Sequence, residues 1–296
     1  MSTKNKGLLM AFVTYLLWGF LSLFWKQLSH VNAYNTFSYR ILWTLISMSV
    51  YMVLARRQSL YKTELKALWE NKSALWAMIW ASLLIATNWL IYIYAVGNGQ
   101  ATEASLGYYI LPLFSVLLSL LFLKEKLSTW TWVSVLMATA GVLLLVVNTG
   151  HLPLVSLILT FSFGLYGFIK KGVKLSSDVA MLVEAMIIAP FALIYLLFFS
   201  KENLLDYSLY ENVLLVLSGP ITAIPLLFFA EAVKRAPLNQ VGFIQYINPT
   251  IQLIFAIFLF GEGITMGELK GFICIWIAIA IFIFGQIAEL RKQNKT

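Results

Sequence analysis

The sequence predicts an all-α membrane protein in which ten transmembrane helices form two inverted-topology repeats of five helices each. Composition, the lengths of the apolar segments and a repeated phrase with exchanged charge lead to this fold class. Of the 296 residues, 60% are hydrophobic and only 11% are charged, whereas about a quarter of a soluble domain is charged. So few charged side chains cannot cover a globular surface, and we therefore expect an integral membrane protein.

Ten apolar segments are long enough to cross a bilayer, because a helix needs about 20 largely apolar residues to span the hydrocarbon core. Several connections, such as Asn98-Gly99-Gln100, are very short, so neighbouring spans must run antiparallel. The alternating pattern of barrel strands is absent, which favours a helical bundle. The first five spans are expected near residues 7–26, 36–55, 73–96, 101–123 and 128–147. The other five are expected near residues 152–169, 178–199, 212–233, 237–260 and 266–287.

The basic residues orient these spans, because Lys and Arg are enriched in the cytoplasmic loops of membrane proteins. Most of the 21 basic residues fall in the N-terminal segment, in every second loop and in the C-terminal segment. With an even number of spans, this bias predicts that both termini are cytoplasmic. The basic segment Met1–Lys6 precedes an apolar run without a small-residue cleavage site, so we interpret that run as a retained span.

A sequence motif that occurs twice indicates an internal repeat. Residues 121–128 read LFLKEKLS, with Glu125 between two lysines, and residues 258–265 read FLFGEGIT, with Glu262 between two glycines. An odd number of spans per copy places these two loops on opposite sides of the membrane, and the positive-inside bias then accounts for the exchange of lysine for glycine. We therefore predict two repeats, the second inverted, over residues 1–148 and 149–296.

The inventory of reactive side chains argues against catalysis. The expected spans contain no paired carboxylates and no Ser/His pair, and His30, His151 and Cys274 are isolated from one another. The chain also lacks the G-x-x-x-x-G-K loop of nucleotide-binding proteins. We therefore expect no enzyme, no catalytic residue, no metal and no cofactor. The net charge of +8 is spread in short clusters between apolar runs, which argues against nucleic acid as a partner.

Inverted repeats are typical of secondary transporters, in which a site near the bilayer midplane opens alternately to each side. The sequence thus favours a secondary transporter that exports small metabolites or drugs by alternating access. Its partners are then a small-molecule substrate, the lipid bilayer and, as the candidate coupling ion, protons. A channel-like protein, a receptor or scaffold without transport, and a membrane-embedded enzyme are the alternatives. No pattern predicts an oligomeric state.

Several long strings are specific enough to compare with a known family. The first half contains Tyr39-Arg40-Ile41-Leu42-Trp43, Asn88-Trp89 and the run from Glu103 to Leu113, and the second half contains SFGLYG at residues 162–167 and GFIQYINPT at residues 242–250. These strings resemble the RarD-type branch of the EamA family, in the drug/metabolite transporter superfamily, a branch associated by name with chloramphenicol sensitivity. The resemblance implies ten helices in two EamA repeats, small-molecule transport and a multi-pass location in the bacterial inner membrane. Tyr39 stands where the resemblance leads one to expect a histidine.

Polar side chains inside apolar segments are the candidate substrate-cavity residues, because an unpaired polar group in hydrocarbon costs several kcal/mol. Arg40 lies inside the second expected span, where it either holds a carboxylate by paired hydrogen bonds or ties helices together near the outer interface. The amides either line a cavity or link helices, and nearby rings either stack on a flat or cationic ligand or pack the bundle. The candidates are Arg40, Asn88, Trp89, Tyr108, Tyr109, Tyr166, Gln245, Tyr246 and Asn248.

Glu184 and Glu103 are the candidates for proton coupling. Glu184 lies inside the seventh expected span, at nearly the same repeat position as Arg40, and burial of a carboxylate favours its protonated form. The alternative for Glu184 is a partly wet carboxylate near the cytoplasmic mouth. Glu103 begins the fourth expected span, where a helix N-terminus also favours an acidic residue. Glu125 and Glu262 are expected to fix the turn into the next span.

Prolines inside the expected spans are the hinge candidates, since each removes a backbone hydrogen bond and tends to kink its helix. Pro112 and Pro249 recur at matching repeat positions, so we predict that they act as symmetric hinges. Pro220 and Pro225, both in the eighth expected span, are the other two candidates.

Overall fold

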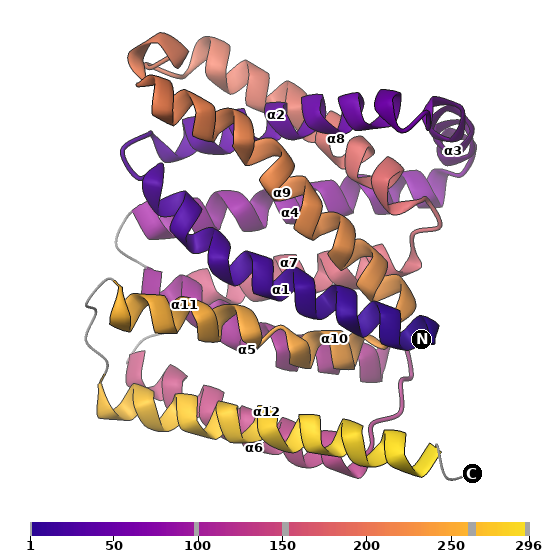
Figure 1. Cartoon of the computed structure of the whole chain (residues 1–296), viewed down its shortest axis with the longest axis vertical. Helices are drawn as coiled ribbons and strands as arrows, with labels where there is room; N and C mark the ends of the chain where they lie inside the picture. The colour runs from indigo at the N-terminus through magenta and orange to yellow at the C-terminus, as the bar shows by residue number, and fades with distance from the viewer. Residues whose placement is uncertain (1, 98–100, 150–153, 260–264, 294–296) are drawn as a thin grey trace.

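The computed structural model describes residues 2–97, 101–149, 154–259 and 265–293. These residues form α-helices and one short 3-10 helix, and no β-strand occurs among them. The long helices lie side by side in a bundle (Figure 1). The prediction of an all-α protein is therefore confirmed for the described part of the chain.

Both halves of the chain contribute long helices to the bundle. The first half contains α1 (Thr3–Gln27), α2 (Ala33–Leu54), α3 (Gln58–Glu70), α4 (Lys72–Gly97), α5 (Ala101–Leu121) and α6 (Thr129–Thr149). The second half contains α7 (Leu154–Gly172), α8 (Ser177–Phe198), the 3-10 helix η1 (Leu204–Asp206), α9 (Leu209–Arg235), α10 (Leu238–Ile244), α11 (Ile247–Phe258) and α12 (Met266–Gln293).

Nine helices of the described residues are long and apolar enough to cross a membrane. The remaining expected span, residues 237–260, is divided between α10 and α11, and Pro249, at which a kink was expected, lies beside the division. Pro249 has no N–H, and its ring meets the carbonyl of Gln245 four residues earlier, which disfavours a continuous helix. At the break, the N–H of Tyr246 donates to the Phe243 carbonyl at 3.3 Å and the N–H of Asn248 donates to the Gln245 carbonyl at 3.0 Å.

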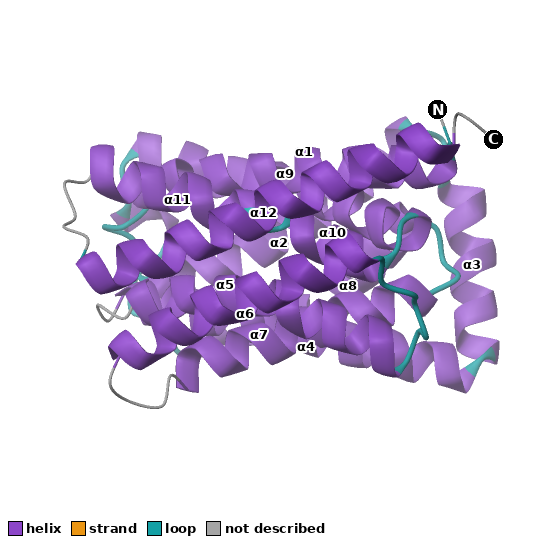
Figure 2. Ribbon diagram, turned by 90° about the horizontal axis from the view of Figure 1, so that it is seen from below, coloured by secondary structure: helices purple, strands orange, loops and turns teal. Residues whose placement is uncertain are grey.

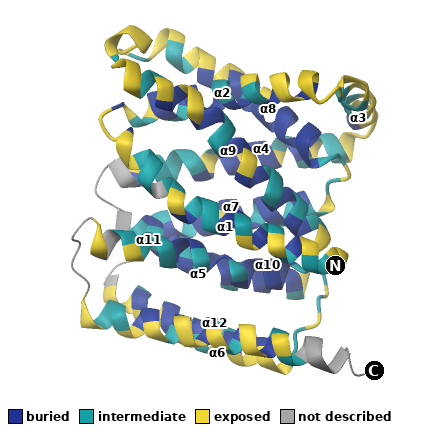
Figure 3. Ribbon diagram, in the orientation of Figure 1, coloured by how far each residue is buried: buried dark blue, intermediate teal, exposed yellow. Residues whose placement is uncertain are grey.

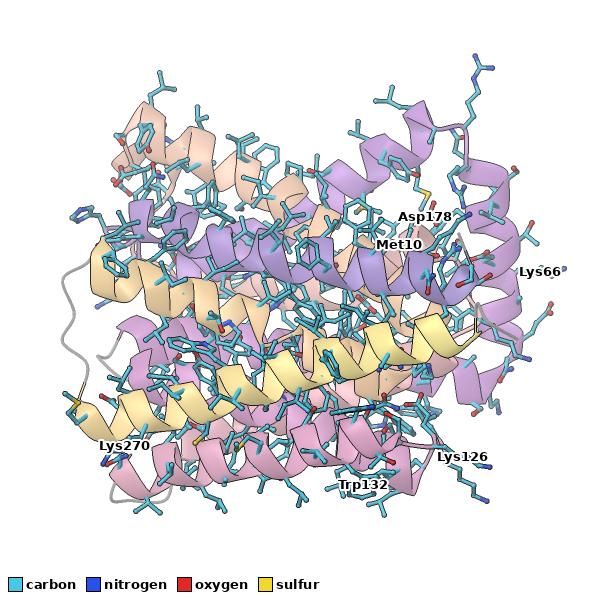
Figure 4. All side chains as sticks on the ribbon, turned by 60° about the horizontal axis from the view of Figure 1, so that its bottom comes forward. Met10, Lys66, Lys126, Trp132, Asp178 and Lys270 are labelled. Carbon is cyan, nitrogen blue, oxygen red and sulfur yellow. The ribbon has the colours of Figure 1, made fainter. Side chains whose placement is uncertain are left out.

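The start of α1 and the end of α12 lie at one end of the bundle, next to α3 (Figure 2). We call this the termini end, and we call the opposite end the far end. Lys66, Lys126 and Asp178 lie at the termini end, and Lys270 lies at the far end (Figure 4). Each cluster of polar residues described below can be placed relative to these two ends.

The short helix α3 lies across the termini end, roughly perpendicular to the long helices (Figure 2). The sequence interpretation treated residues 56–72 as a loop and so missed this helix. Polar contacts tie it to the start of α8: Glu64 Oε2 accepts from the backbone N–H and the hydroxyl of Ser176 at 2.8 and 2.9 Å, and Arg57 Nε lies 2.5 Å from Asp178 Oδ2. The helix α3, which lies between α2 and α4 in the sequence, is therefore attached to the second half of the chain.

The interior of the bundle is built jointly by the two halves. α2 packs against α8 and α9, α4 and α5 pack against α7, α1 packs against α9, and α6 packs against α12. Buried residues line these contacts, while many large apolar side chains are exposed on the outward faces (Figure 3). Extensive apolar surface of this kind marks a protein that is covered by a membrane.

Candidate functional site

Arg40 is the centre of a buried group of aromatic and polar side chains. It lies about two turns into α2, and only 8% of its surface is exposed. The guanidinium carbon lies 4.7 Å from the centroid of the Trp25 ring and 3.9 Å from the centroid of the Trp89 ring. Cation–π contacts of this kind are worth roughly 0.5–2 kcal/mol. We call the group the arginine cluster; it comprises Trp25, Arg40, Asn88, Trp89, Tyr92 and Tyr108.

The Arg40 guanidinium has no partner of opposite charge in the described part of the chain. Its Nε is buried without a hydrogen-bond partner, and none of the ion pairs among the described residues includes Arg40. Tyr92 and Tyr108 lie in electrostatic range, but a tyrosine hydroxyl supplies no countercharge at neutral pH. Because an uncompensated charge inside a membrane is costly, the cluster is suited to receive a negative group from outside the protein.

Asn88 organises one wall of the arginine cluster. Its Nδ2 donates to the backbone carbonyl of Leu159 at 2.9 Å and to the hydroxyl of Ser162 at 3.0 Å, which ties α4 to α7. The Tyr108 hydroxyl donates to Asn88 Oδ1 at 3.4 Å, and the ring centroids of Tyr92 and Tyr108 lie 5.7 Å apart. The amide is thus held in place by α7, whereas the long bond leaves the Tyr108 hydroxyl free to change partners.

Glu184 is also buried, but it is paired. Its Oε1 lies 2.7 Å from Lys170 Nζ, and the two side chains are only 5% and 1% exposed. The Tyr166 hydroxyl donates to Oε2 at 3.2 Å. Lys170 belongs to the last turn of α7, and its ammonium group is compensated by the carboxylate of α8. We call Tyr166, Lys170 and Glu184 the glutamate cluster.

Glu125 stabilises the corner between α9 and α10. Its carboxylate accepts from the backbone N–H groups of Leu238 at 2.9 Å and Asn239 at 3.2 Å, the first residues of α10. A carboxylate at a helix N-terminus satisfies free N–H groups and interacts favourably with the helix dipole. Lys171 Nζ lies 3.6 Å from Glu125 Oε1. A structural role at a turn was expected for Glu125, but the turn that it caps belongs to the other half of the chain.

Lys171 completes the same corner from the other side. Its ammonium group donates to the backbone carbonyls of Val233 at 3.0 Å and Ala236 at 2.8 Å, at the end of α9. We call Glu125 and Lys171 the clasp, because together they hold the end of one helix and the start of the next. Glu262, the repeat counterpart of Glu125, lies outside the described residues.

The remaining candidate cavity residues have contacts of their own. Tyr109 and Tyr246 are buried, with ring centroids 6.3 Å apart, and Asn248 Oδ1 accepts from Gln252 at 3.0 Å. Gln245 lines a cavity of about 10 Å³, which is about the room needed for one water molecule. The structure therefore brings together Arg40, Asn88, Trp89 and Tyr108, places Tyr166 beside Glu184, and brings Tyr109 next to Tyr246.

The four candidate hinge prolines and Glu103, the second candidate for proton coupling, lie in different parts of their helices. Pro112 lies inside the continuous helix α5, and Pro220 and Pro225 lie inside α9. Pro249 is the third residue of α11, directly after the break. Glu103 lies in the first turn of α5, at the far end. The two repeat-related prolines thus stand in one unbroken and one broken segment.

Trp25 and Lys170 are site residues that sequence reasoning missed. A signal for them exists: in the register that matches Gly19 with Gly164, Trp25 corresponds to Lys170. Trp25 contacts Arg40, and Lys170 contacts Glu184, so the same repeat position faces the charged residue of the next helix in each half. The sequence pattern does not show this, because it does not reveal which faces of the two helices meet.

These observations define the class of protein: a multi-pass helical membrane protein whose polar groups are gathered inside an apolar shell. No group of three or more His, Cys, Asp or Glu side chains that could hold a metal ion occurs among the described residues. The chain belongs to the EamA-like transporter family, whose model matches residues 5–147 and 152–284.

Relatives place the chain in the RarD-type branch of that family. It is 42% identical over 291 residues to the uncharacterized transporter YojE of Bacillus subtilis (strain 168), which covers 98% of this chain and 97% of the relative. It is 34% identical over 294 residues to the protein RarD of Escherichia coli (strain K12), which covers 98% of each chain. A crystal structure with 18% sequence identity and a TM-score of 0.71, covering 95% of this chain and 98% of the other, has the same fold.

Proposed function

We propose that this transporter exports small metabolites or drugs across the bacterial inner membrane by alternating access. The observation that carries the proposal is the arginine cluster, where an uncompensated cation is walled by aromatic and amide side chains from α1, α4 and α5. A buried polar site with apolar walls can orient a small solute inside the bundle. Membership of a transporter family supports this assignment.

The proposed topology has ten crossings, made by the nine long helices together with α10 and α11 taken as one. The two segments that match the family model support two EamA repeats, which we assign to residues 1–148 and 149–296, the second inverted. The termini end carries Lys66 and Lys126 (Figure 4), together with most of the loop lysines and arginines. By the positive-inside rule, we assign this end, and with it both termini, to the cytoplasm.

The proposed cycle alternates between opening the termini end and opening the far end. In the described arrangement the clasp and the glutamate cluster hold helices together on the termini side. Opening that side requires the corner between α9 and α10 to leave Glu125 and Lys171. Pro220 and Pro225 in α9 and the break beside Pro249 lack regular backbone hydrogen bonds, so bending is easiest there.

Protons are the coupling ion in this proposal, with Glu184 as the carrier. Lys170 and Tyr166 contact its carboxylate, and Lys234 of α9 lies in electrostatic range. A proton taken up by Glu184 would remove the attraction that holds Lys170 and would loosen the contact between α7 and α8. Glu103, at the far end of α5, is the second candidate carrier.

The experiment is a transport screen with the full chain in proteoliposomes under an imposed pH gradient. We expect at least one small organic solute to move faster than in protein-free vesicles. Arg40→Ala should abolish this transport, while Lys66→Ala, an exposed position whose ion pair among the described residues is with Glu70 of its own helix, should leave it unchanged. Glu184→Gln should remove the dependence on the pH gradient. Failure of every solute in a broad panel to exceed the protein-free control would contradict the proposal.

A further inference from the structure

We propose that the arginine cluster binds a monocarboxylate with a flat aromatic body. This inference rests on the proposed function, because it names the substrate class of the same site. Three observations on the cluster lead to it: the charge of Arg40 is uncompensated, its guanidinium lies over two indole rings and has an unpartnered Nε, and the neighbouring side chains are aromatic.

The first observation concerns charge. Arg40 is buried, and no ion pair among the described residues includes it. A neutral ligand would leave this charge uncompensated, and a cationic ligand would add to it. A single guanidinium balances one negative charge, so a dianion such as a phosphate monoester would carry surplus charge into the bundle, which is costly. Charge therefore favours a monoanion.

The second observation concerns geometry. Trp25 and Trp89 lie at 4.7 and 3.9 Å from the guanidinium carbon, so the guanidinium packs over two indole rings. The buried Nε of this guanidinium has no hydrogen-bond partner among the described residues. Two parallel N–H donors in the plane of a guanidinium match the two oxygens of a carboxylate. Arg40 can therefore hold a carboxylate through paired hydrogen bonds, and the charge argument above disfavours a phosphate monoester.

The third observation concerns the ligand body. The rings of Tyr92 and Tyr108 lie next to each other at 57°, and the Tyr108 hydroxyl has only a long bond to Asn88 at 3.4 Å. With the indoles of Trp25 and Trp89, these rings offer edges and faces on which a flat ring can stack. The Tyr108 hydroxyl can turn towards a carboxylate oxygen. An aromatic body therefore fits these walls better than a strongly hydrated one.

The test uses one ring with different charges, on the purified full chain in lipid nanodiscs. The probes are phenylacetate (−1), phenylacetamide (neutral), phenethylamine (+1) and phenyl phosphate (−2), with cyclohexylacetate as a monocarboxylate that lacks a flat ring. Binding is measured by tryptophan fluorescence and by calorimetry. We expect phenylacetate to bind about tenfold or more tightly than phenylacetamide, because hydrogen bonds to charged groups are the stronger ones. Tighter binding of phenyl phosphate, phenylacetamide or phenethylamine than of phenylacetate would overturn the inference, as would no binding of phenylacetate.

Variants connect the charge preference to Arg40. Arg40→Ala should weaken phenylacetate binding about ten- to hundredfold and leave phenylacetamide binding nearly unchanged. Arg40→Lys keeps the positive charge but lacks the two parallel N–H donors of the guanidinium, so its loss of phenylacetate affinity should be intermediate. This variant serves as the test if Arg40→Ala does not fold. Trp89→Leu should weaken phenylacetate more than cyclohexylacetate. The matched control Lys66→Ala should bind phenylacetate as the parent does, and equal binding by parent and Arg40→Ala would refute the assignment.

The two levels of proposal fail in different ways. Proteoliposomes that transport another solute, from a protein that does not bind phenylacetate, would leave the transporter assignment standing and overturn the substrate class. Conversely, Arg40-dependent binding of phenylacetate without transport of any solute would support the site and contradict the proposed function.

Discussion

Arg40 and Glu184 occupy matching places in α2 and α8, and the protein treats their charges in opposite ways. Each side chain lies about two turns inside the start of its helix and is almost fully buried. Glu184 is compensated internally by Lys170, whereas Arg40 packs over Trp25 and Trp89 and has no countercharge among the described residues. The charge of Glu184 is thus compensated within the fold, whereas the charge of Arg40 can be compensated by a bound ligand.

The largest expected effect comes from breaking the internal pair. Lys170→Met leaves Glu184 buried without its partner, and losing one member of a buried ion pair destabilises a protein by about 3–5 kcal/mol. The double variant Lys170→Met/Glu184→Met removes both charges and should recover most of this loss. Thermal unfolding of the purified protein in detergent, followed by tryptophan fluorescence, measures both. A double variant as unstable as the single one would show that the ion pair is not the reason for the loss.

The same substitution at Arg40 should behave differently. Arg40→Met removes no ion pair, and the loss of cation–π contacts worth roughly 0.5–2 kcal/mol is offset by removal of a buried charge. We therefore expect its stability to stay within about 1–2 kcal/mol of the parent, while transport is lost. The same unfolding assay and the transport screen measure the two effects. A destabilisation as large as that of Lys170→Met would mean that Arg40 is a structural residue, and the comparison would collapse.

A smaller effect is expected at the clasp. Glu125→Ala leaves the first N–H groups of α10 without their acceptor, and loss of such a cap costs about 0.5–2 kcal/mol. Glu125→Gln keeps an acceptor oxygen, so it should lose less. Unfolding of the two variants in detergent tests this order. Equal stability of Glu125→Ala and the parent would show that water replaces the carboxylate at this corner.

The smallest effect is expected at the ion pair that ties α3 to α8. The Arg57 side chain is 37% exposed, so solvent screens its attraction to Asp178, and such pairs contribute about 0.2–1 kcal/mol. A double-mutant cycle with Arg57→Ala and Asp178→Ala measures the coupling. A coupling above about 2 kcal/mol would place this pair with the buried ones and not with the exposed ones.

The segments that begin at Gly107 in the first repeat and at Gly242 in the second show how far the sequence predicts local structure. Gly107 and Pro112 in α5 match Gly242 and Pro249, but the second pair is separated by two more residues. Two extra residues rotate the remainder of a helix by about 200°, so a continuous helix could not keep both anchors on their original faces. The second copy instead breaks at Gln245 and Tyr246. The sequence indicates the repeat, but it does not predict the break between α10 and α11, because each proline alone is compatible with a kinked, continuous helix.

The helix α3 was missed for a different reason. Its charged residues were interpreted as an orienting loop, although Tyr61, Leu65 and Leu68 recur at helical spacing among them. In the structure Leu68 is buried and Trp69 is exposed, so the segment is an amphipathic helix that lies on the end of the bundle. A search for spans by length and apolarity cannot find such a helix, because it does not cross the membrane.

The sequence by itself determined that the protein is helical, lies in the membrane and has Arg40, Asn88 and Glu184 inside its apolar segments. These properties result from segment length and from the high cost of a lipid-exposed polar group, and both are local. Only the tertiary structure decided which buried charge is paired. Lys170 of α7 pairs with Glu184 of α8, and Glu125 caps helix α10, which begins more than a hundred residues further along the chain. Such partners depend on which helix faces meet, and that is a property of packing that no single segment carries.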